Sequence, residues 1–282
     1  MQFSLIIIGD EILSGHRQDK HFEHVLGLIK ARGLALSSVQ YLGDDRELIT
    51  LAMRRAIDSG QVVFSCGGIG ATPDDHTRQS VAAALGVPLA LHPIAADRIA
   101  QRCADRGEPD MTLPENQSRL KMGEFPVGAD IIENPYNKIP GFSVAGHSNG
   151  QANGGRLYCV PGFPVMAWPM IEAVLDTSYA HLFHSQVQLA EAFLVYNLPE
   201  SAITPLMEQV ERECAPAKAY SLPSVGDANG RPNIELGAKS LATAPEALAK
   251  AMVMLRAGVE VLGGEIRAMW FRSRCTELGS DH

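Results

Sequence analysis

The sequence lacks any long hydrophobic run. No apolar stretch approaches the ~18 residues that a membrane-spanning helix needs. The chain begins "MQFSLIIIGDE", with no basic residues ahead of an apolar segment that is only about as long as one strand. We therefore expect neither a signal peptide nor a membrane anchor.

Cysteines are few and scattered. The five of them form no C-x-x-C pair, and their number is odd. This pattern excludes a disulfide framework and a paired-cysteine zinc site, so we expect a protein of the reducing cytoplasm. The cysteines are Cys66, Cys103, Cys159, Cys214 and Cys275.

Positive charge is also in short supply. The 282 residues include 24 Lys and Arg against 32 Asp and Glu, a net charge of -8. Nucleic-acid backbones are bound by clustered Lys and Arg, so we do not expect a nucleic-acid partner. Residues 180–262 also show no Gly-x-x-Gly loop flanked by basic residues. A small anion can still bind, if backbone amides or a metal supply the positive field.

What the chain does contain is ordinary globular composition, with 46% apolar and 20% charged residues. Its length favours about two domains, which we place at residues 1–178 and 179–282. In the first, apolar segments alternate with helical patterns that end in glycine, which predicts a mostly parallel sheet covered on both faces. The second has a β-α-β-β-α order, typical of a small α+β domain. In the first domain the expected strands are 3–9, 34–43, 61–65 and 156–160, the expected helices are 19–33, 45–60, 74–86 and 92–107, and residues 161–176 are expected to form a loop that leads into a further helix.

The segment "SCGGIGATPDDHT", residues 65–77, connects an apolar strand to a helix expected to begin near Asp74 or Asp75. Its glycines let the backbone approach a ligand, and free amides at a helix start attract phosphate. The same letters are also typical of a tight turn capped by an aspartate, and both interpretations stay open.

Acidic residues follow glycine at the end of each of the first three strands. They are Asp10 and Glu11, Asp44 and Asp45, and Asp74 and Asp75. Adjacent parallel strands bring such turns to one rim of a sheet, where ligands of this fold class bind. Carboxylates beside a phosphate pocket favour a divalent cation such as Mg²⁺. The alternatives are that Glu11 is structural and that Asp44 or Asp45 only caps the next helix.

The histidines carry a weaker signal. His21 and His24, and His181 and His184, are three residues apart without an obvious third metal ligand, so we expect solvent-facing helix positions. His76 lies within the segment 65–77, where contact with a ligand is the alternative to the expected position on a helix surface. No G-x-S-x-G, Walker loop or Cys/His pairing supports nucleophilic catalysis.

The motifs together resemble a known family. "GDEILSG", "GDDR", "GGIGATPDDHT" and "PGFP" occur in the order of the MoaB/Mog-like (MoCF) molybdopterin-binding domain, and look most like its version at the N-terminus of CinA proteins. "PENQSRLKMGEFPVGADIIENP" and "IPGF" resemble further segments of that domain. The resemblance covers residues 3–175, and residues 185–262 look like the small, KH-like domain that follows in CinA proteins.

The resemblance implies a three-layer α/β/α domain, an oligomer such as a dimer or trimer, and a nucleotide or pterin ligand. It suggests a metal-dependent ADP-ribose pyrophosphatase, with molybdopterin binding in cofactor biosynthesis or a non-catalytic regulatory module as alternatives. The implied catalytic residues are Asp44 and Asp75, and the implied ligands of a Mg or Co ion are Asp74 and Asp75. The expected ligand- and phosphate-binding residues are Gly9, Glu11, Ser14, Gly15, Gly67, Gly68, Gly70, Thr72, Pro161 and Gly162.

Three departures from the family are visible. The nicotinamide-nucleotide deamidase domain of full-length CinA proteins has no counterpart in this sequence, so we do not expect that activity. Ala71 replaces the usual proline of the glycine-rich loop. Val165 and Met166 stand where relatives carry an acid after the second proline of "PGFP".

Overall fold

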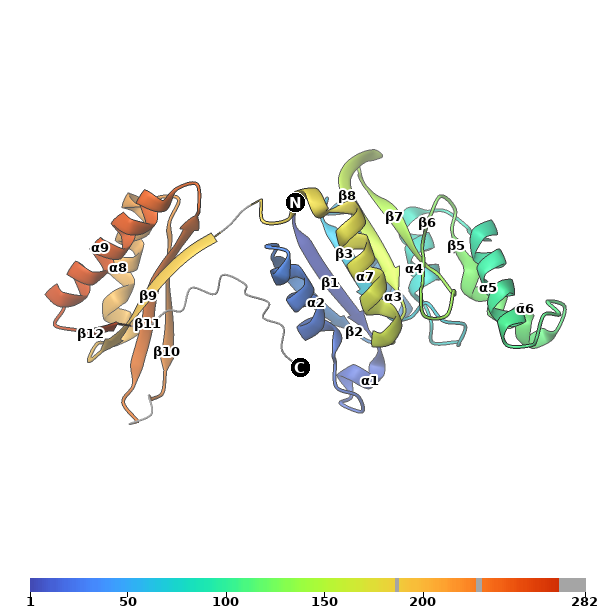
Figure 1. Cartoon of the computed structure of the whole chain (residues 1–282), viewed down its shortest axis with the longest axis horizontal. Helices are drawn as coiled ribbons and strands as arrows, with labels where there is room; N and C mark the ends of the chain where they lie inside the picture. The colour runs from blue at the N-terminus through green and yellow to red at the C-terminus, as the bar shows by residue number, and fades with distance from the viewer. Residues whose placement is uncertain (186–187, 227–229, 269–282) are drawn as a thin grey trace. The chain divides into compact units, whose positions relative to one another are not determined.

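The structure is a computed structural model that describes residues 1–185, 188–226 and 230–268. The chain forms two compact units, one over Met1–Phe183 and one that begins at His184. The first contains the alternating strands and helices, and the second contains a separate sheet with its own helices (Figure 1). The boundary at 178 falls at the end of a helix, and the first unit continues past it.

A six-stranded sheet forms the centre of the first unit. The strands β2, β1, β3 and β8 lie side by side and run parallel, and β7 and β6 continue the sheet in antiparallel fashion. All six residues of β1 are buried, as expected for a strand covered on both faces. The mostly parallel sheet is confirmed. Its strands are β1 (Phe3–Ile8), β2 (Leu36–Leu42), β3 (Val62–Cys66), β6 (Asp130–Ile132), β7 (Gly141–Ser148) and β8 (Gln151–Val160).

Helices cover both faces of this sheet and make three layers (Figure 1). On one face, α2 (His21–Ala31) and α7 (Pro164–Ser178) pack Ile29 and Met170 against the sheet. On the other, α3 (Arg46–Asp58) and α4 (Thr77–Leu85) contribute a second apolar cluster. The remaining elements are α1 (Asp10–Leu13), α5 (Pro93–Asp105), α6 (Pro114–Leu120), the short 3-10 helices at Lys121–Gly123 and Ala180–Leu182, and the paired strands β4 (Leu89–Leu91) and β5 (Glu124–Pro126).

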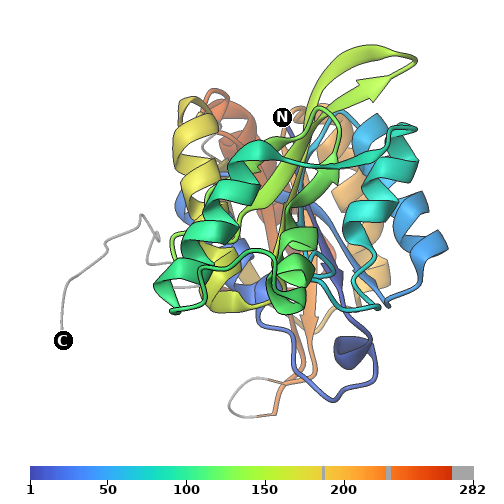
Figure 2. The same ribbon diagram turned by 90° about the vertical axis from the view of Figure 1, so that its right-hand side faces the viewer.

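The segment "GHSNGQANGG" forms the hairpin expected from its composition. Asn149 and Gly150 connect β7 to β8, and both have positive φ, 52° and 75°. Two such residues match the right-handed twist of the flanking strands. Figure 2 shows this hairpin projecting beyond the rest of the unit.

The second unit is a small α+β domain. Its antiparallel sheet has the order β10-β11-β9-β12, and Phe193, Leu236 and Leu255 are fully buried where the helices pack on it. The β-α-β-β-α order is confirmed, with β12 as an additional strand. The elements are β9 (Gln188–Tyr196), α8 (Glu200–Glu213), β10 (Lys218–Ser224), β11 (Asn233–Leu241), α9 (Pro245–Val261) and β12 (Glu265–Ala268).

The four cysteines among the described residues are buried and form no disulfide, and Cys275 lies outside the described ranges. Across the same ranges, the helices are too short or too polar to span a membrane.

Candidate functional site

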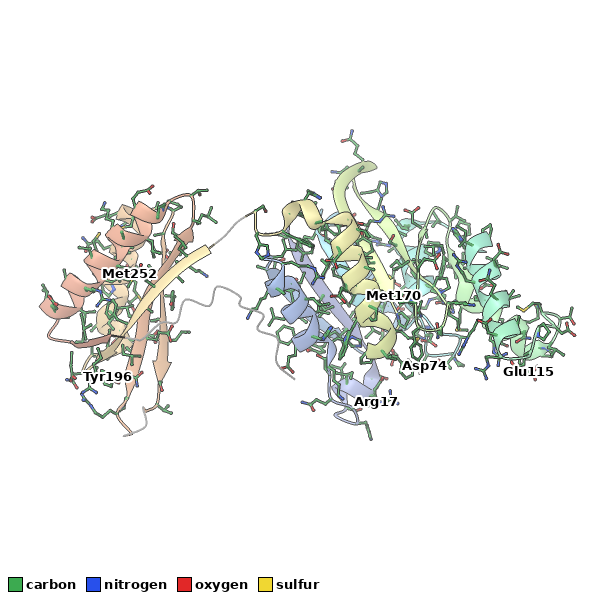
Figure 3. The ribbon with its side chains drawn as sticks, viewed as in Figure 1. Arg17, Asp74, Glu115, Met170, Tyr196 and Met252 are labelled. Atoms are coloured by element: carbon green, nitrogen blue, oxygen red, sulfur yellow. The ribbon has the colours of Figure 1, made fainter. Side chains whose placement is uncertain are left out.

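The carboxyl ends of β2, β1 and β3 bring three loops to one rim of the sheet. The amide of Gly9 donates to the carbonyl of Leu42 at 3.0 Å, which joins the loops after β1 and β2. Figure 3 shows Arg17 and Asp74 at this same end of the unit, although they follow different strands. The convergence expected from the sequence is therefore present.

Asp10 and Asp44 hold two of these loops together. The Asp44 carboxylate accepts from the Asp10 amide at 2.9 Å, and the Asp10 carboxylate accepts from the Asp44 amide at 3.1 Å. A Cβ on Gly43 would collide with the Asp10 carboxylate, so glycine is needed here. Asp45 instead caps α3 by accepting from Leu48 at 2.8 Å. The two adjacent acids thus divide the roles that the sequence left open.

The acidic rim, defined here as Asp10, Glu11, Asp44 and Asp74, gathers four carboxylates, of which Asp74 has its pKa lowered by a hydrogen bond from the Thr72 side chain and by the charge of His76. The pKa of Asp44 is raised, first by burial and then by the charges of the other three, against the hydrogen bond from the Asp10 amide. Within the described ranges, none of the four forms an ion pair with a Lys, Arg or His. A cation at this rim would favour the charged form of Asp44.

Asp75 does not cap the following helix, whose N-terminus has no side-chain cap, so the capping alternative that the sequence left open is excluded. Its Oδ2 accepts from the Thr72 amide at 2.9 Å and from the Thr72 hydroxyl, and lies against Gly70. The helix begins later, at Thr77, whose amide donates to the Gly68 carbonyl at 2.9 Å. Asp75 therefore shapes the glycine-rich loop, and its Oδ1 stays free of hydrogen bonds to described residues.

The loop offers backbone amides to a ligand, although fewer than expected. The amides of Gly67 and Thr72 are already bonded, to the Val160 carbonyl and to Asp75. The amides of residues 68–71 donate no hydrogen bond to any residue that the structure describes. Consecutive free amides at a glycine turn form a concave site for an anion. Gly68 and Gly70 belong to this run of free amides, and their role in binding phosphate stays a prediction.

Arg78 holds this loop through a hydrogen bond to the Gly70 carbonyl, a role that the sequence did not predict. It is buried, and its guanidinium donates to the carbonyls of Gly70 at 2.6 Å, Glu124 at 3.4 Å and Lys121. Burial lowers its pKa, partly offset by the charges of Glu124 and Asp75. An arginine in the first turn of a helix carries no sequence signal for burial, because such positions usually face solvent.

A cavity of about 340 Å³ opens beside the rim, between the ends of β1, β3 and β8. Of the expected ligand-binding residues, Glu11 and Gly162 line it, while Gly9 and Pro161 are chain neighbours of lining residues. Ser14 and Gly15 lie on an exposed turn, where the Ser14 hydroxyl pairs with His16 at 2.8 Å. The full lining is Ile7, Ile8, Glu11, Ile12, Arg17, Gln18, Lys20, His21, Cys66, Gly162, Phe163 and Pro164.

His21 is buried, with 5% of its surface exposed, so the expected solvent-facing position was wrong. Asp19 fixes its backbone by accepting from its amide at 2.8 Å. Nε2 must donate in the 2.9 Å bond to the Gly162 carbonyl, because a carbonyl only accepts. Nδ1 has no partner in the described part of the chain. This hydrogen bond joins the start of α2 to the loop after β8, and no local sequence pattern predicts a contact between such distant segments.

The other histidines differ in exposure. His24 is half-buried and stacks on Trp168 with ring centres 3.8 Å apart, and burial lowers its pKa. His76 is half-buried and precedes α4. His181 and His184 are exposed, as expected.

The rim carboxylates fit a cation that takes only some of its ligands from the protein. Among the described residues, no three His, Cys, Asp or Glu side chains are arranged to hold a metal ion. Mg²⁺ is commonly held by one or two carboxylates together with waters and substrate phosphates. Asp44 and Asp74, which interact through their charges, suit that arrangement.

Comparison with known proteins shows the family to which the chain belongs. Residues 4–181 match the family described as "Probable molybdopterin binding domain". A protein of Aeropyrum pernix is 30% identical over 93% of this chain and 95% of its own length. A CinA-like protein of Anaeromyxobacter dehalogenans is 32% identical over 74% of this chain but only 49% of its own length. The matched region thus spans about half of the CinA-like proteins.

One solved structure also shares the fold. The CinA protein of Thermoplasma acidophilum, described as of unknown function, is 26% identical, with a TM-score of 0.52 over 62% of this chain and 98% of its own. The chain therefore belongs to the molybdopterin-binding MoaB/Mog family, in the form found at the N-terminus of CinA-like proteins.

Proposed function

We propose that the rim binds a nucleotide diphosphate and, with a divalent cation, hydrolyses it, with ADP-ribose as the model substrate. The observation that supports this proposal is that backbone N–H groups, which attract anions, follow the same strand as a carboxylate, which attracts cations. Four consecutive free amides, at residues 68–71, follow the same strand as the acidic rim residue Asp74. Amides suit phosphate oxygens, and unpaired carboxylates suit the cation that accompanies phosphates.

The chain's own groups would divide the work as follows. The amides of residues 68–71 hold the diphosphate, and Asp75 and Arg78 keep that loop in shape. Asp44 and Asp74 would hold a Mg or Co ion, with waters and the substrate phosphates as its other oxygen ligands. Such an ion neutralises charge on the phosphates and makes bound water more acidic.

We assign Asp44 the role of taking a proton from water, because its carboxylate interacts with the charges of all three other rim residues. The water oxygen bonds to one phosphorus, the bridging P–O bond breaks, and the bridging oxygen leaves with the second phosphate. From ADP-ribose the products are AMP and ribose 5-phosphate.

The test is incubation of the purified chain with ADP-ribose and Mg²⁺ or Co²⁺, with AMP measured by chromatography. AMP should form with the metal and stop when a chelator is added. No turnover across ADP-ribose, NAD and other dinucleotides with either metal would exclude the hydrolase.

Molybdopterin binding is a second candidate, favoured by the family match over residues 4–181. A pterin phosphate could use the same free amides. The test is the fluorescence spectrum of pterin released from the purified protein by denaturation. Pterin in near-stoichiometric amount, together with no turnover of dinucleotides, would select this function.

A further inference from the structure

A second cavity lies at the edge of the sheet opposite the rim. It measures about 490 Å³, within the ~300–1,000 Å³ typical of ligand pockets. Its lining includes Asn149 and Gly150, the turn between β7 and β8. Because β8 runs parallel to β3, this turn lies at the amino ends of these strands, whereas the rim lies at the carboxyl ends. The cavity is therefore separate from the proposed nucleotide site.

Two helices end at this cavity. Asp58 is the last residue of α3 and Leu85 is the last residue of α4, and both line it. Helix C-termini carry partial negative charge on carbonyls that have no partner within the helix. The carbonyls of Ala84 and Leu85 accept no hydrogen bond from a described residue. Pro88, four residues after Ala84, has no N–H to donate, so the last turn of α4 keeps unpaired acceptors.

The Asp58 side chain adds a full negative charge. It is exposed and forms no ion pair in the described part of the chain, although Arg54 lies one turn earlier on α3. Asp105, at the same place on α5, instead pairs with Lys138 at 2.6 Å. A carboxylate at a helix C-terminus is repelled by the helix dipole, so Asp58 does not stabilise its own helix. No Lys or Arg of the described ranges lines the cavity, and this unbalanced charge favours a bound cation.

The walls decide which kind of cation fits. Val87, Val127 and Val144 line the cavity, and Val127 is 53% exposed. Apolar walls stabilise a hydrocarbon chain by removing it from water, and offer nothing to a hydrated metal ion. Asp58 is also the only carboxylate among the described lining residues, which is few for a metal site. An organic cation therefore fits better than a metal ion.

We propose that this cavity binds an organic ammonium ion. Its ammonium group lies against Asp58 and the ends of α3 and α4, and its hydrocarbon chain lies along Val127 and Val144. The inference does not depend on the proposed function of the rim.

The test is calorimetry on the full chain with hexylamine, hexanol and hexanoate as probes. The titrations are made at pH 8, where histidines such as His147 in the lining are ordinarily neutral and primary amines stay protonated. Hexylammonium should bind, and uncharged hexanol should bind about fivefold more weakly, as expected for loss of one exposed ion pair. Hexanoate, which has the opposite charge, should bind most weakly.

Asp58→Asn removes the charge but keeps the size of the side chain. It should weaken hexylammonium about fivefold and leave hexanol within about twofold. Its melting temperature should be equal to that of wild type or higher, because the repulsion between the carboxylate and the helix dipole is lost. A purely structural role of Asp58 would lower the melting temperature instead. Asp105→Asn is the matched control at the end of α5 and should leave the affinity unchanged.

A second variant fills the cavity. Ala145 lines it from an exposed position on β7, so Ala145→Phe introduces a ring there without crowding the core. This variant should abolish the binding of both hexylammonium and hexanol. Ala152→Phe, exposed on the paired strand β8 and outside the lining, should bind both probes as wild type does.

The acidic rim is the competing place for an amine, and the outcomes distinguish the two. Hexylammonium binding that is lost in Ala145→Phe and unaffected by Mg²⁺ or ADP-ribose supports the inference. Binding that persists in Asp58→Asn and Ala145→Phe but falls in Asp44→Asn places the amine at the rim and overturns it. Equal affinity for hexanol and hexylammonium, or no binding of hexylammonium, also overturns it. None of these results depends on AMP release, so failure of the hydrolase and failure of this inference are separate.

Discussion

Asp10 and Asp44 exchange hydrogen bonds, each carboxylate accepting from the other residue's backbone amide, at 2.9 and 3.1 Å. The exchange joins the loops after β1 and β2 and sets two negative charges side by side. Burial and the charges of Asp10, Glu11 and Asp74 raise the pKa of Asp44. The rim carboxylates thus repel one another, and a bound cation would relieve this repulsion.

The first prediction concerns pH and follows from the raised pKa of Asp44. A carboxyl with a raised pKa binds more protons in the folded state, so its contribution to stability falls as pH rises from its ordinary value of 3.8 through the raised one. Asp44→Asn, whose amide oxygen can still accept from Asp10, should therefore melt slightly above wild type at pH 7 and not at pH 3.5. Solvent screening keeps the gain below ~1 kcal/mol. Thermal melts across pH measure it.

The same rim should make the melting temperature depend on magnesium. Mg²⁺ should raise the melting temperature of wild type at pH 7, because the ion binds the ionised rim of the folded state. The increase should shrink at pH 3.5 and in Asp44→Asn. An equal increase in all three conditions would place the ion elsewhere.

The second prediction concerns Gly70 and Asp75. A Cβ on Gly70 would collide with the Asp75 carboxylate and push it away from Thr72. Gly70→Ala and Asp75→Ala should each weaken phosphate binding about tenfold, while the double variant loses little more than either one. This non-additivity is expected of residues in contact. Additive losses in a calorimetric double-mutant cycle would show that the two side chains act independently.

The third prediction concerns Arg78. Arg78→Met leaves three carbonyls without their donor, and should lower the unfolding free energy by about 2 kcal/mol, or ~4–8 °C in melting temperature. Arg54→Met, an exposed position on α3, should change it by less than ~0.5 kcal/mol. Equal effects in thermal melts would contradict the bracing role of Arg78.

The fourth prediction concerns Phe163. Because 58% of this side chain is exposed, Phe163→Ala should alter stability little but weaken the binding of AMP about tenfold through lost stacking on its adenine ring. Val165→Ala, 52% exposed in the first turn of α7 and outside the cavity lining, is the control. An unchanged affinity of Phe163→Ala in calorimetry would show that the ligand does not stack on Phe163.

Much of the fold could be predicted because its signals are local. Apolar strands, glycine stops and helical periodicity predict the βαβ order, and strand adjacency predicts that Asp10, Asp44 and Asp74 meet. The antiparallel strand β6 and the added strand β12 are only 3 and 4 residues long, too short for a periodic pattern.

The site was harder to predict where a contact is distant or a side chain has two uses. The bond from His21 to Gly162 joins positions 141 residues apart, so the sequence alone made His21 a surface residue. An aspartate cap was one of two interpretations open for residues 65–77, and only the structure shows that the Asp75 carboxylate accepts from Thr72 instead. Either of Asp44 and Asp45 could have been the cap, and only the geometry of Leu48 and Asp10 distinguishes them.

The most direct test compares two adjacent acids. Asp44→Asn and Asp45→Asn remove the same charge from the same loop, but Asn at position 45 still caps α3, while Asn at position 44 can neither take a proton nor bind the ion as well. With ADP-ribose and Mg²⁺, the rate of AMP release should fall at least 100-fold in Asp44→Asn, the lower range for loss of a general base, and stay within about twofold of wild type in Asp45→Asn. Equal rates in the two variants would contradict the catalytic rim.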